Sequence, residues 1–235
     1  ITATITEGDL ATLASLADIN TNNALTVTVT DTSVAAAALN TLDGKTSVNV
    51  TATAATAITG TAAAIATALS AATIDHSAAN IVATVDAGSV AAADLNTIDT
   101  NSDNAVVATA ATTITGSAGD VITAYTANDN STISGLGNEA LSLSGNTSVA
   151  NQVTLDGKTT GIITATITEG DLATLASLAD ANTNNALTVT VTDTTVAVAD
   201  LNTLNGKTTV AVNAAAITTL TGSLSDVQTA YTAND

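Results

Sequence analysis

The sequence predicts an α/β solenoid in which parallel β-strands alternate with short helices and the chain coils in the right-handed sense. Three observations predict this fold: internal repeats along the whole chain, a change of hydrophobic periodicity inside each repeat, and a composition suited to a thin core. We expect a single domain over residues 1–235, similar in plan to leucine-rich repeats but without their consensus. A parallel sheet should line one side and the helices the other.

The internal repeats are nested. Residues 1–50 match residues 163–212 at an offset of 162, with 43 identities in 50 positions. A second match joins residues 113–129 to residues 219–235 at an offset of 106. Because two different offsets occur, the elementary repeat must be shorter than either of them.

The elementary repeat is found by cutting the chain wherever an alternating apolar and polar pattern begins. This gives nine predicted coils of roughly 21 to 35 residues, a length typical of solenoid repeats. The coils begin near Ile1, Leu25, Val48, Ile81, Val106, Leu141, Ile162, Leu187 and Val210.

Each predicted coil opens with a strand pattern of period two. In two copies of one repeat, alternate residues are large and aliphatic while threonine lies between them. This pattern predicts strands with one buried face and one solvent face. The residues expected to point inward are Leu25, Val27, Val29, Leu187, Val189 and Val191.

Helical patterns with their own start and stop signals follow the strands. The motif Ser/Thr-x-x-Asp begins at Thr6, Ser117, Thr168 and Ser223, and predicts a helix N-cap at each hydroxyl residue. Glycine follows a leucine-rich turn at Gly44, Gly157 and Gly206, where we expect a left-handed residue to end the helix.

The composition limits what the core can contain. Alanine and threonine each occur 50 times, there is no Phe, Trp, Met, Cys or Pro, and the only aromatic residues are Tyr125 and Tyr231. An apolar fraction of 46% nevertheless excludes a simple disordered tract. A thin, regular core of Ile, Leu, Val and Ala is the remaining option.

The formal charge of −18 bounds the partners. It disfavours nucleic acid and anionic membrane surfaces, which bind through Lys and Arg. We expect no membrane insertion, because no apolar run of about 18 residues occurs. Neither end of the chain has a distinct polar cap, so we expect either self-association through the solenoid ends or a place within a longer array.

One loop has the spacing of a cation site. Asp99, Asn101 and Asp103 form a D-x-N-x-D pattern, which can turn three oxygen ligands toward a calcium ion. Asn104 and Ala110 stand where an EF-hand loop has glycine and glutamate, so the alternative is a plain polar loop. Calcium is the only cofactor that the sequence suggests.

The remaining motifs favour bland interpretations. The three lysines follow Gly in a GKT sequence, but the phosphate-loop pattern needs a further Gly where Leu39, Gln152 and Leu201 stand. His76 is the only histidine and lies in a polar stretch. With no Cys and no nucleophile elbow, we expect that the protein is not an enzyme.

Threonine rows suggest one surface function. Alternate threonines occur in T-x-T-x-T rows that would lie on the solvent face of stacked strands, resembling the threonine faces of ice-binding solenoids. The simpler interpretation is that threonine is a good solvent-facing strand residue. The rows begin at Thr2, Thr26, Thr164 and Thr188.

Phrases such as TLTGSLSDVQTAYTAND, ISGLGNEALSLSG and LNTLDGKTTG resemble the Ala/Thr/Asp-rich tandem repeats of very large bacterial cell-surface proteins, of the type found in marine cyanobacteria. The resemblance is one of repeat style over the whole chain and transfers no site residues. It implies an exported, extracellular or cell-surface structural protein. The alternative is an adhesin that binds a glycan, ice or another surface ligand, or a calcium-loaded spacer.

Overall fold

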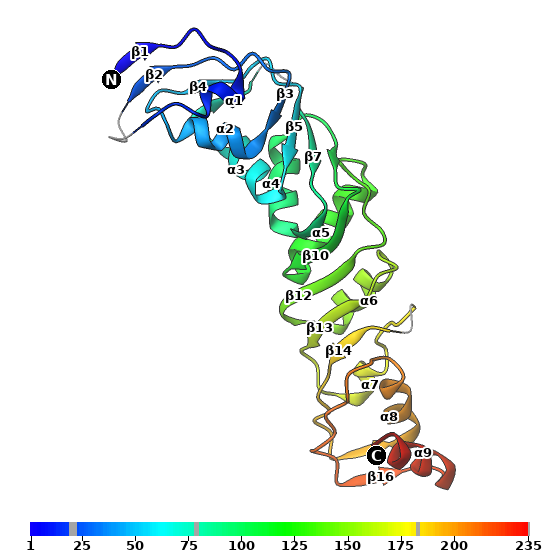
Figure 1. Cartoon of the computed structure of the whole chain (residues 1–235). Helices are drawn as coiled ribbons and strands as arrows, with labels where there is room; N and C mark the ends of the chain where they lie inside the picture. The colour runs from blue at the N-terminus through cyan, green and yellow to red at the C-terminus, as the bar shows by residue number, and fades with distance from the viewer. Residues whose placement is uncertain (19–22, 78–79, 182–183, 235) are drawn as a thin grey trace. The chain divides into compact units, whose positions relative to one another are not determined.

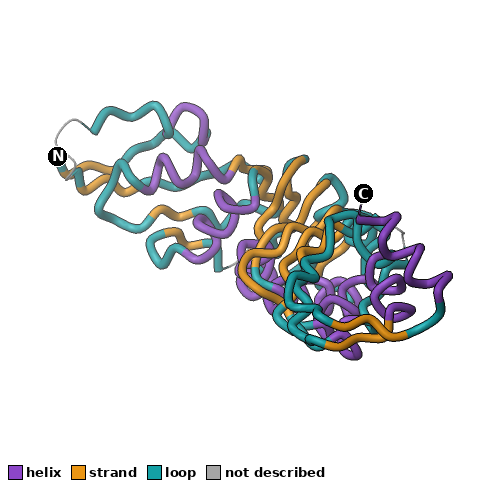
Figure 2. The backbone as a smooth tube through the Cα atoms, turned by 90° about the horizontal axis from the view of Figure 1, so that it is seen from below, coloured by secondary structure: helices purple, strands orange, loops and turns teal. Residues whose placement is uncertain are grey.

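The computed structural model describes residues 1–18, 23–77, 80–181 and 184–234. It is an α/β structure in which short parallel strands alternate with short helices along the chain, as Figures 1 and 2 show. The described residues contain nine helices, and the strands form open sheets. The predicted α/β class with parallel strands is therefore confirmed.

The chain divides into two compact units. Unit 1 consists of Ile1–Thr112 and Thr123–Leu136, and unit 2 of Thr113–Ile122 and Gly137–Asp235. Two elements, β10 (Ala111–Gly116) and α5 (Ala118–Asp129), contribute residues to both.

Unit 1 contains four complete helices and ten strands. They are β1 (Thr2–Thr4), α1 (Leu10–Leu13), β2 (Ala24–Thr26), β3 (Ser33–Ala35), α2 (Ala36–Asp43), β4 (Val50–Thr51), β5 (Ala57–Gly60), α3 (Ala62–Ser70), β6 (Ile74–Asp75), β7 (Val82–Val85), β8 (Gly88–Ala91), α4 (Ala92–Asn101), β9 (Val106–Val107) and β11 (Ile133–Ser134). Its largest sheet has the order β11-β9-β7-β5-β3.

Unit 2 contains four complete helices and five strands in addition to its part of β10. They are β12 (Ala140–Thr147), α6 (Val149–Asp156), β13 (Ile163–Ile167), α7 (Leu172–Leu175), β14 (Ala186–Thr188), β15 (Thr195–Ala197), α8 (Val198–Asn205), β16 (Thr219–Thr221) and α9 (Leu224–Asn234). Strands β14, β13, β12 and β10 lie side by side in that order, and β15 pairs with β16.

The strand pairing has a nearly constant sequence offset. Among the named strands, the offset between parallel partners ranges from that of Asn146 with Thr166 to that of Val106 with Ile133. These offsets are close to the length of one predicted coil. Each strand therefore pairs with the equivalent part of the next repeat.

The expectation of one continuous sheet was wrong, because the sheets are several and separate. A strand begins within two residues of eight of the predicted coil starts; at the ninth, near Val210, the described residues have only an isolated bridge at Asn213. The sequence analysis missed the second strands that lead into the helices, such as β3 and β5. It also missed β6 and β11, which lie inside the two longest predicted coils.

The core consists of columns of aliphatic side chains at paired positions. In unit 1, Val34, Ile58 and Ala83 are paired in register and at most 2% exposed. The six residues predicted to point inward are all buried, at 0 to 5% exposure. The period-two pattern thus identified the buried face correctly.

Two of the four predicted N-caps are correct. The Ser117 hydroxyl accepts from the Asp120 amide at 3.1 Å, and Ser223 binds Asp226 in the same way. The caps predicted at Thr6 and Thr168 were wrong: α1 and α7 begin later than expected, with Asp9 and Asp171 as caps.

The late start of α1 has a local cause. The carbonyl of Gly8 accepts from the amide of Thr30 at 2.9 Å, so the backbone before α1 is engaged with the following repeat instead of with its own helix. Glu7 supports this arrangement, because its side chain accepts from the amides of Gly8 and Asp9.

The glycines that end three helices do not adopt the predicted left-handed conformation. Gly44, Gly157 and Gly206 have φ angles of −66°, −77° and −74° and remain right-handed. Each helix ends instead in a tightened turn, in which the amide of the following lysine donates at 2.9 Å to the carbonyl of the last leucine of the helix.

Candidate functional site: the joints between successive repeats

The residues proposed for calcium lie in two kinds of structure. Asp99 and Asn101 belong to the last turn of α4, while Asp103 follows the helix. Residues two apart on a helix do not face each other, so the structure does not bring Asp99 and Asn101 together as a loop would. The Asn101 amide donates to the Thr97 carbonyl at 2.8 Å. In the part of the chain that is described, no group of three His, Cys, Asp or Glu side chains could hold a metal ion.

His76 also has a local role. Its Nε2 lies 3.1 Å from the carbonyl oxygen of Leu69, near the end of α3. The neighbouring Asp75 accepts from the Ser77 hydroxyl at 2.7 Å and from the Ser77 amide at 3.1 Å. These bonds, with a smaller contribution from the charge of His76, hold the pKa of Asp75 below its usual value.

The most elaborate polar arrangements join one repeat to the next. The first is a threonine latch, formed by Thr46 and Thr208 in the GKT turns. The Thr46 hydroxyl donates to the Leu25 carbonyl at 2.8 Å and accepts from the Leu25 amide at 2.9 Å, and Thr208 does the same with Leu187. In the third turn, Thr159 donates to the Glu139 carbonyl at 2.6 Å.

The latch corrects the emphasis of the sequence analysis. Lysine and glycine drew attention in the GKT motif because of its likeness to a phosphate loop. The structure gives the specific contact to the threonine, whose hydroxyl completes the hydrogen bonding of a backbone segment in the preceding repeat. The signal was available, because Thr follows Lys in all three turns.

Asparagine side chains join neighbouring helices. Asn40 of α2 donates to the carbonyl of Ala64 in α3 at 2.9 Å, and Asn202 of α8 donates to the carbonyl of Asp226 in α9 at 3.0 Å. Both asparagines stand in the sequence Leu-Asn-Thr-Leu. The motif thus places the same contact in both units.

Carboxylates from a later repeat cap helices of the repeat before. Asp31 accepts from the Leu10 amide at 2.7 Å, Asp193 from the Leu172 amide at 2.7 Å, and Glu169 from the Val149 amide at 3.0 Å. An anion at a helix N-terminus satisfies a free amide and interacts favourably with the helix dipole. Part of the acidic excess therefore stabilises the stacking of repeats.

A buried polar cluster in unit 2 departs from the repeat pattern. Gln152 is fully buried, and its amide group pairs with both the amide and the carbonyl of Ala179, at 3.0 and 2.7 Å. Asp156 accepts from Asn185 at 2.8 Å and from the Ala181 amide at 3.1 Å. Gln152 stands where other repeats have Leu39 and Leu201, and that exception could have identified the cluster from the sequence.

The threonine rows lie on the solvent face, as predicted. Thr166 and Thr188 are exposed and paired in register, with Asn146 beside Thr166 on the preceding strand. Thr4 and Thr26 form the equivalent pair in unit 1. The register therefore places exposed threonine side chains beside one another on neighbouring strands.

Comparison of the chain with protein-family models, with curated proteins and with solved structures found no match. None of the helices in the described residues has the length and apolar character needed to cross a membrane. The geometry that bears on function is therefore that of the joints between repeats.

Proposed function

We propose that this chain is a structural repeat protein of the cell surface or extracellular matrix, folded as one right-handed α/β solenoid of about nine coils. The observation that carries the proposal is the strand register, in which each parallel partner lies about one repeat further along the chain. Such an offset is the pattern expected when every repeat contacts its neighbours in sequence.

The proposed role is mechanical. The threonine latch, the asparagine bridges between helices and the carboxylate caps all cross from one repeat to the next. Each repeat is thus tied to its neighbour through its strands and through its helix. Sliding or bending of one repeat against the next would break several hydrogen bonds at once, so the array should be stiff.

The surface location is supported by composition. A chain with no cysteine, a charge of −18 and repeats in the style of large bacterial surface proteins fits an exported, soluble array. An antibody raised against the chain should label intact cells of the source organism. Labelling only after the cells are permeabilised would contradict this part of the proposal.

The solenoid is tested by deleting one repeat in register. Removal of the segment 164–185 joins Ile163 to Ala186, which occupies the position of Thr164 in the register. In a solenoid the shortened chain should fold and melt cooperatively. Removal of 164–174 alone is the control and should unfold unit 2, because it leaves half a repeat. Unfolding of both variants would refute the nearest-neighbour architecture.

A second candidate is a binding module that uses the threonine rows. The in-register exposure of Thr166 and Thr188 favours it, because two stacked rows give a regular hydroxyl and methyl surface. Thermal hysteresis of ice growth, or a shift of melting temperature with a glycan, would support this alternative. Unchanged ice growth and melting would leave the structural role.

A further inference from the structure

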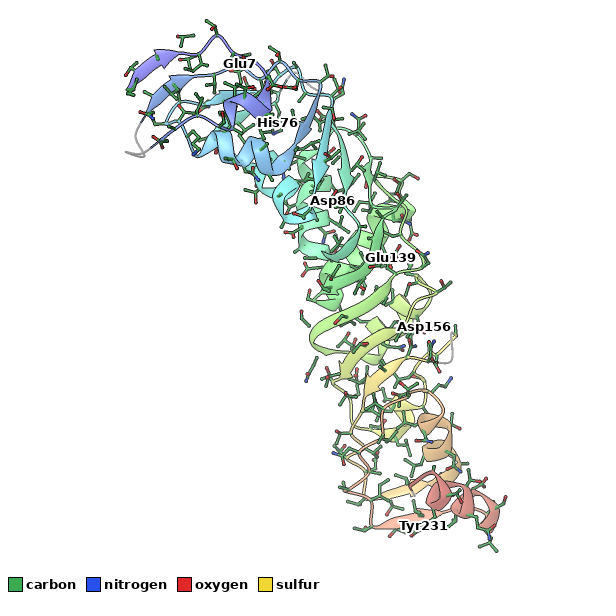
Figure 3. All side chains as sticks on the ribbon, viewed as in Figure 1. Glu7, His76, Asp86, Glu139, Asp156 and Tyr231 are labelled. Atoms are coloured by element: carbon green, nitrogen blue, oxygen red, sulfur yellow. The ribbon has the colours of Figure 1, made fainter. Side chains whose placement is uncertain are left out.

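The last repeat exposes apolar side chains that are buried in its internal copy. Residues 113–129 and 219–235 are identical at 13 of 17 positions, and the serine cap has matching geometry in both. Tyr125 is 1% exposed, whereas its copy Tyr231, labelled on the last helix in Figure 3, is 64% exposed. Because the local structures match, the difference arises from what packs against each copy.

The difference extends over a whole face. Ile114 and Val121 are fully buried, whereas their copies Leu220 and Val227 are partly exposed. A hollow of about 410 Å³ lies on this face. Its lining includes Leu201, Ala214, Ile217, Leu220, Val227 and Tyr231. We call the surface formed by Leu220, Val227 and Tyr231 the C-terminal face.

The first repeat shows the complementary condition. Ile1 is 83% exposed, whereas its copy Ile163 is fully buried. Ala3 and Ile5 are partly exposed, while their copies Ala165 and Ile167 are 5% and 6% exposed. Ile1, Ala3 and Ile5 thus form a second uncovered apolar surface, the N-terminal face.

Both faces also carry an open strand edge. Within the described residues, β1 pairs only with β2, and β16 pairs only with β15. The internal copy of β1 is β13, which pairs on both sides, with β12 and with β14. The internal copy of β16 is β10, which pairs with β12. The open edges of β1 and β16 thus correspond to edges at which this sequence accepts a parallel strand.

We propose that the C-terminal face binds the N-terminal face of a second copy of this chain, with β1 of that copy added in parallel to β16. The proposal rests on the proposed solenoid and specifies how its ends meet. The register follows from unit 2, where Ile114, Leu141 and Ile163 form one buried column. Leu220 and Ile1 are the copies of its outer members and lie opposite each other in the complex.

A second copy is the occupant that the two faces favour. The faces differ from each other, and each has apolar side chains and an open strand edge of the kind that the other can satisfy. Such a heterologous contact repeats from copy to copy and gives linear assemblies instead of closed dimers.

The charge of the chain sets the conditions for assembly. Two copies with a formal charge of −18 each repel one another, and salt screens this repulsion over about 10 Å at 0.1 M. Apolar burial does not depend on such screening. Assembly should therefore increase with ionic strength.

The test is sedimentation velocity with negative-stain electron microscopy on the whole chain, over a range of protein concentrations, in about 0.02 M and about 0.5 M salt. We expect linear oligomers that lengthen with concentration and with salt. Tyr231→Glu and Ala3→Glu should each leave monomers. Thr229→Glu and Thr4→Glu are matched controls, because they add the same charge at exposed positions on the same elements, and they should assemble normally.

Mixing the two blocked variants makes the test specific. Ala3→Glu retains an intact C-terminal face and Tyr231→Glu retains an intact N-terminal face, so an equal mixture should form dimers and nothing longer. Monomers of the unmodified chain under every condition, or oligomers that persist in both blocked variants, would overturn the proposal. Folded monomers that tolerate removal of the segment 164–185 would refute the docking alone and leave the proposed solenoid intact.

Discussion

The hydroxyl of Thr46 donates to the carbonyl of Leu25 at 2.8 Å and accepts from the amide of the same residue at 2.9 Å. One side chain thus takes the place of a backbone partner for a strand residue of the preceding repeat. Thr208 and Leu187 repeat the arrangement with the same two distances. The joint is therefore a property of the repeat rather than of one position.

Replacement of Thr46 by valine should weaken unit 1. Valine keeps the shape of the side chain but leaves the amide and carbonyl of Leu25 without this partner, at a cost of about 1–3 kcal/mol. Urea unfolding should show a lower midpoint. Thr46→Ser retains the hydroxyl and should recover most of the loss; equal losses in both variants would show that the methyl group matters more than the latch.

Replacement of Val189 by aspartate should unfold the surrounding repeat. Val189 is 1% exposed, and an unpaired carboxylate at this position would be buried without a partner. The cost should be at least about 3 kcal/mol. Limited proteolysis near residues 185–195 reports the local loss. The neighbouring Thr190→Asp, on the solvent face, should retain near-native stability, and instability of both would contradict the inward and outward assignment.

Gln152→Leu restores the residue type that other repeats have at this position, and it should nevertheless destabilise unit 2. Leucine cannot satisfy the amide and carbonyl of Ala179, which Gln152 pairs at 3.0 and 2.7 Å. We expect a loss of about 1–3 kcal/mol in denaturant unfolding. Val153→Ala, at a site 40% exposed on the same helix, should have a much smaller effect. A stabilised Gln152→Leu would show that hydrophobic packing outweighs the pairing.

Two glycines that lie close in sequence should respond differently to alanine. A Cβ on Gly161 would collide with the backbone carbonyl of Glu139 and lie 2.7 Å from the amide nitrogen of Ala140, so Gly161→Ala must displace the backbone. Gly157 has φ −77°, and its nearest contact would be 3.6 Å away. Gly157→Ala should therefore be tolerated or raise the melting temperature. A large loss at Gly157 would instead support the left-handed turn that the sequence suggested.

Asp9 should make the stability of unit 1 depend on pH in the acid range. The side chain and the amide of Thr12 both donate to its carboxylate and hold the pKa of Asp9 below the usual value of 3.8. A carboxyl group with a lowered folded-state pKa stabilises fully above the unfolded pKa, and this contribution is lost as pH falls through the folded pKa.

The measurement compares Asp9→Ala with the unmodified chain. The difference in melting temperature should be full above about pH 4.5 and shrink as the pH falls below the unfolded value. Asp9→Asn keeps a cap acceptor and should show a smaller difference at neutral pH. A difference that stays constant down to about pH 2 would show that the charge of Asp9 is unimportant.

The sequence predicted the periodic features of the fold well. The inward residues Val27 and Val189, and the caps at Ser117 and Ser223, follow from patterns that depend only on neighbours in sequence. The short second strands were missed because stretches such as Ser33–Ala35 lack alternation, and their strand conformation depends on pairing with the next repeat.

The joints were less predictable for the same reason. Whether the Thr46 hydroxyl faces solvent or the Leu25 backbone depends on how two repeats stack, which one repeat alone does not contain. Gly44 was expected to be left-handed because glycine commonly ends helices in that way, but here a tightened turn ends the helix. Gln152 was identifiable only as an exception to the repeat, and its partner Ala179 belongs to the next repeat.

The short offset between paired strands also bears on how the chain folds. Parallel sheets usually fold slowly, because distant segments must meet before any pairing is rewarded. Here the paired residues are separated by only about a tenth of the chain length, which is a contact order typical of helical bundles. Any adjacent pair of repeats can act as a nucleus, and growth then adds one neighbour at a time in either direction. A chain that emerges slowly during synthesis could therefore complete each repeat before the next is made.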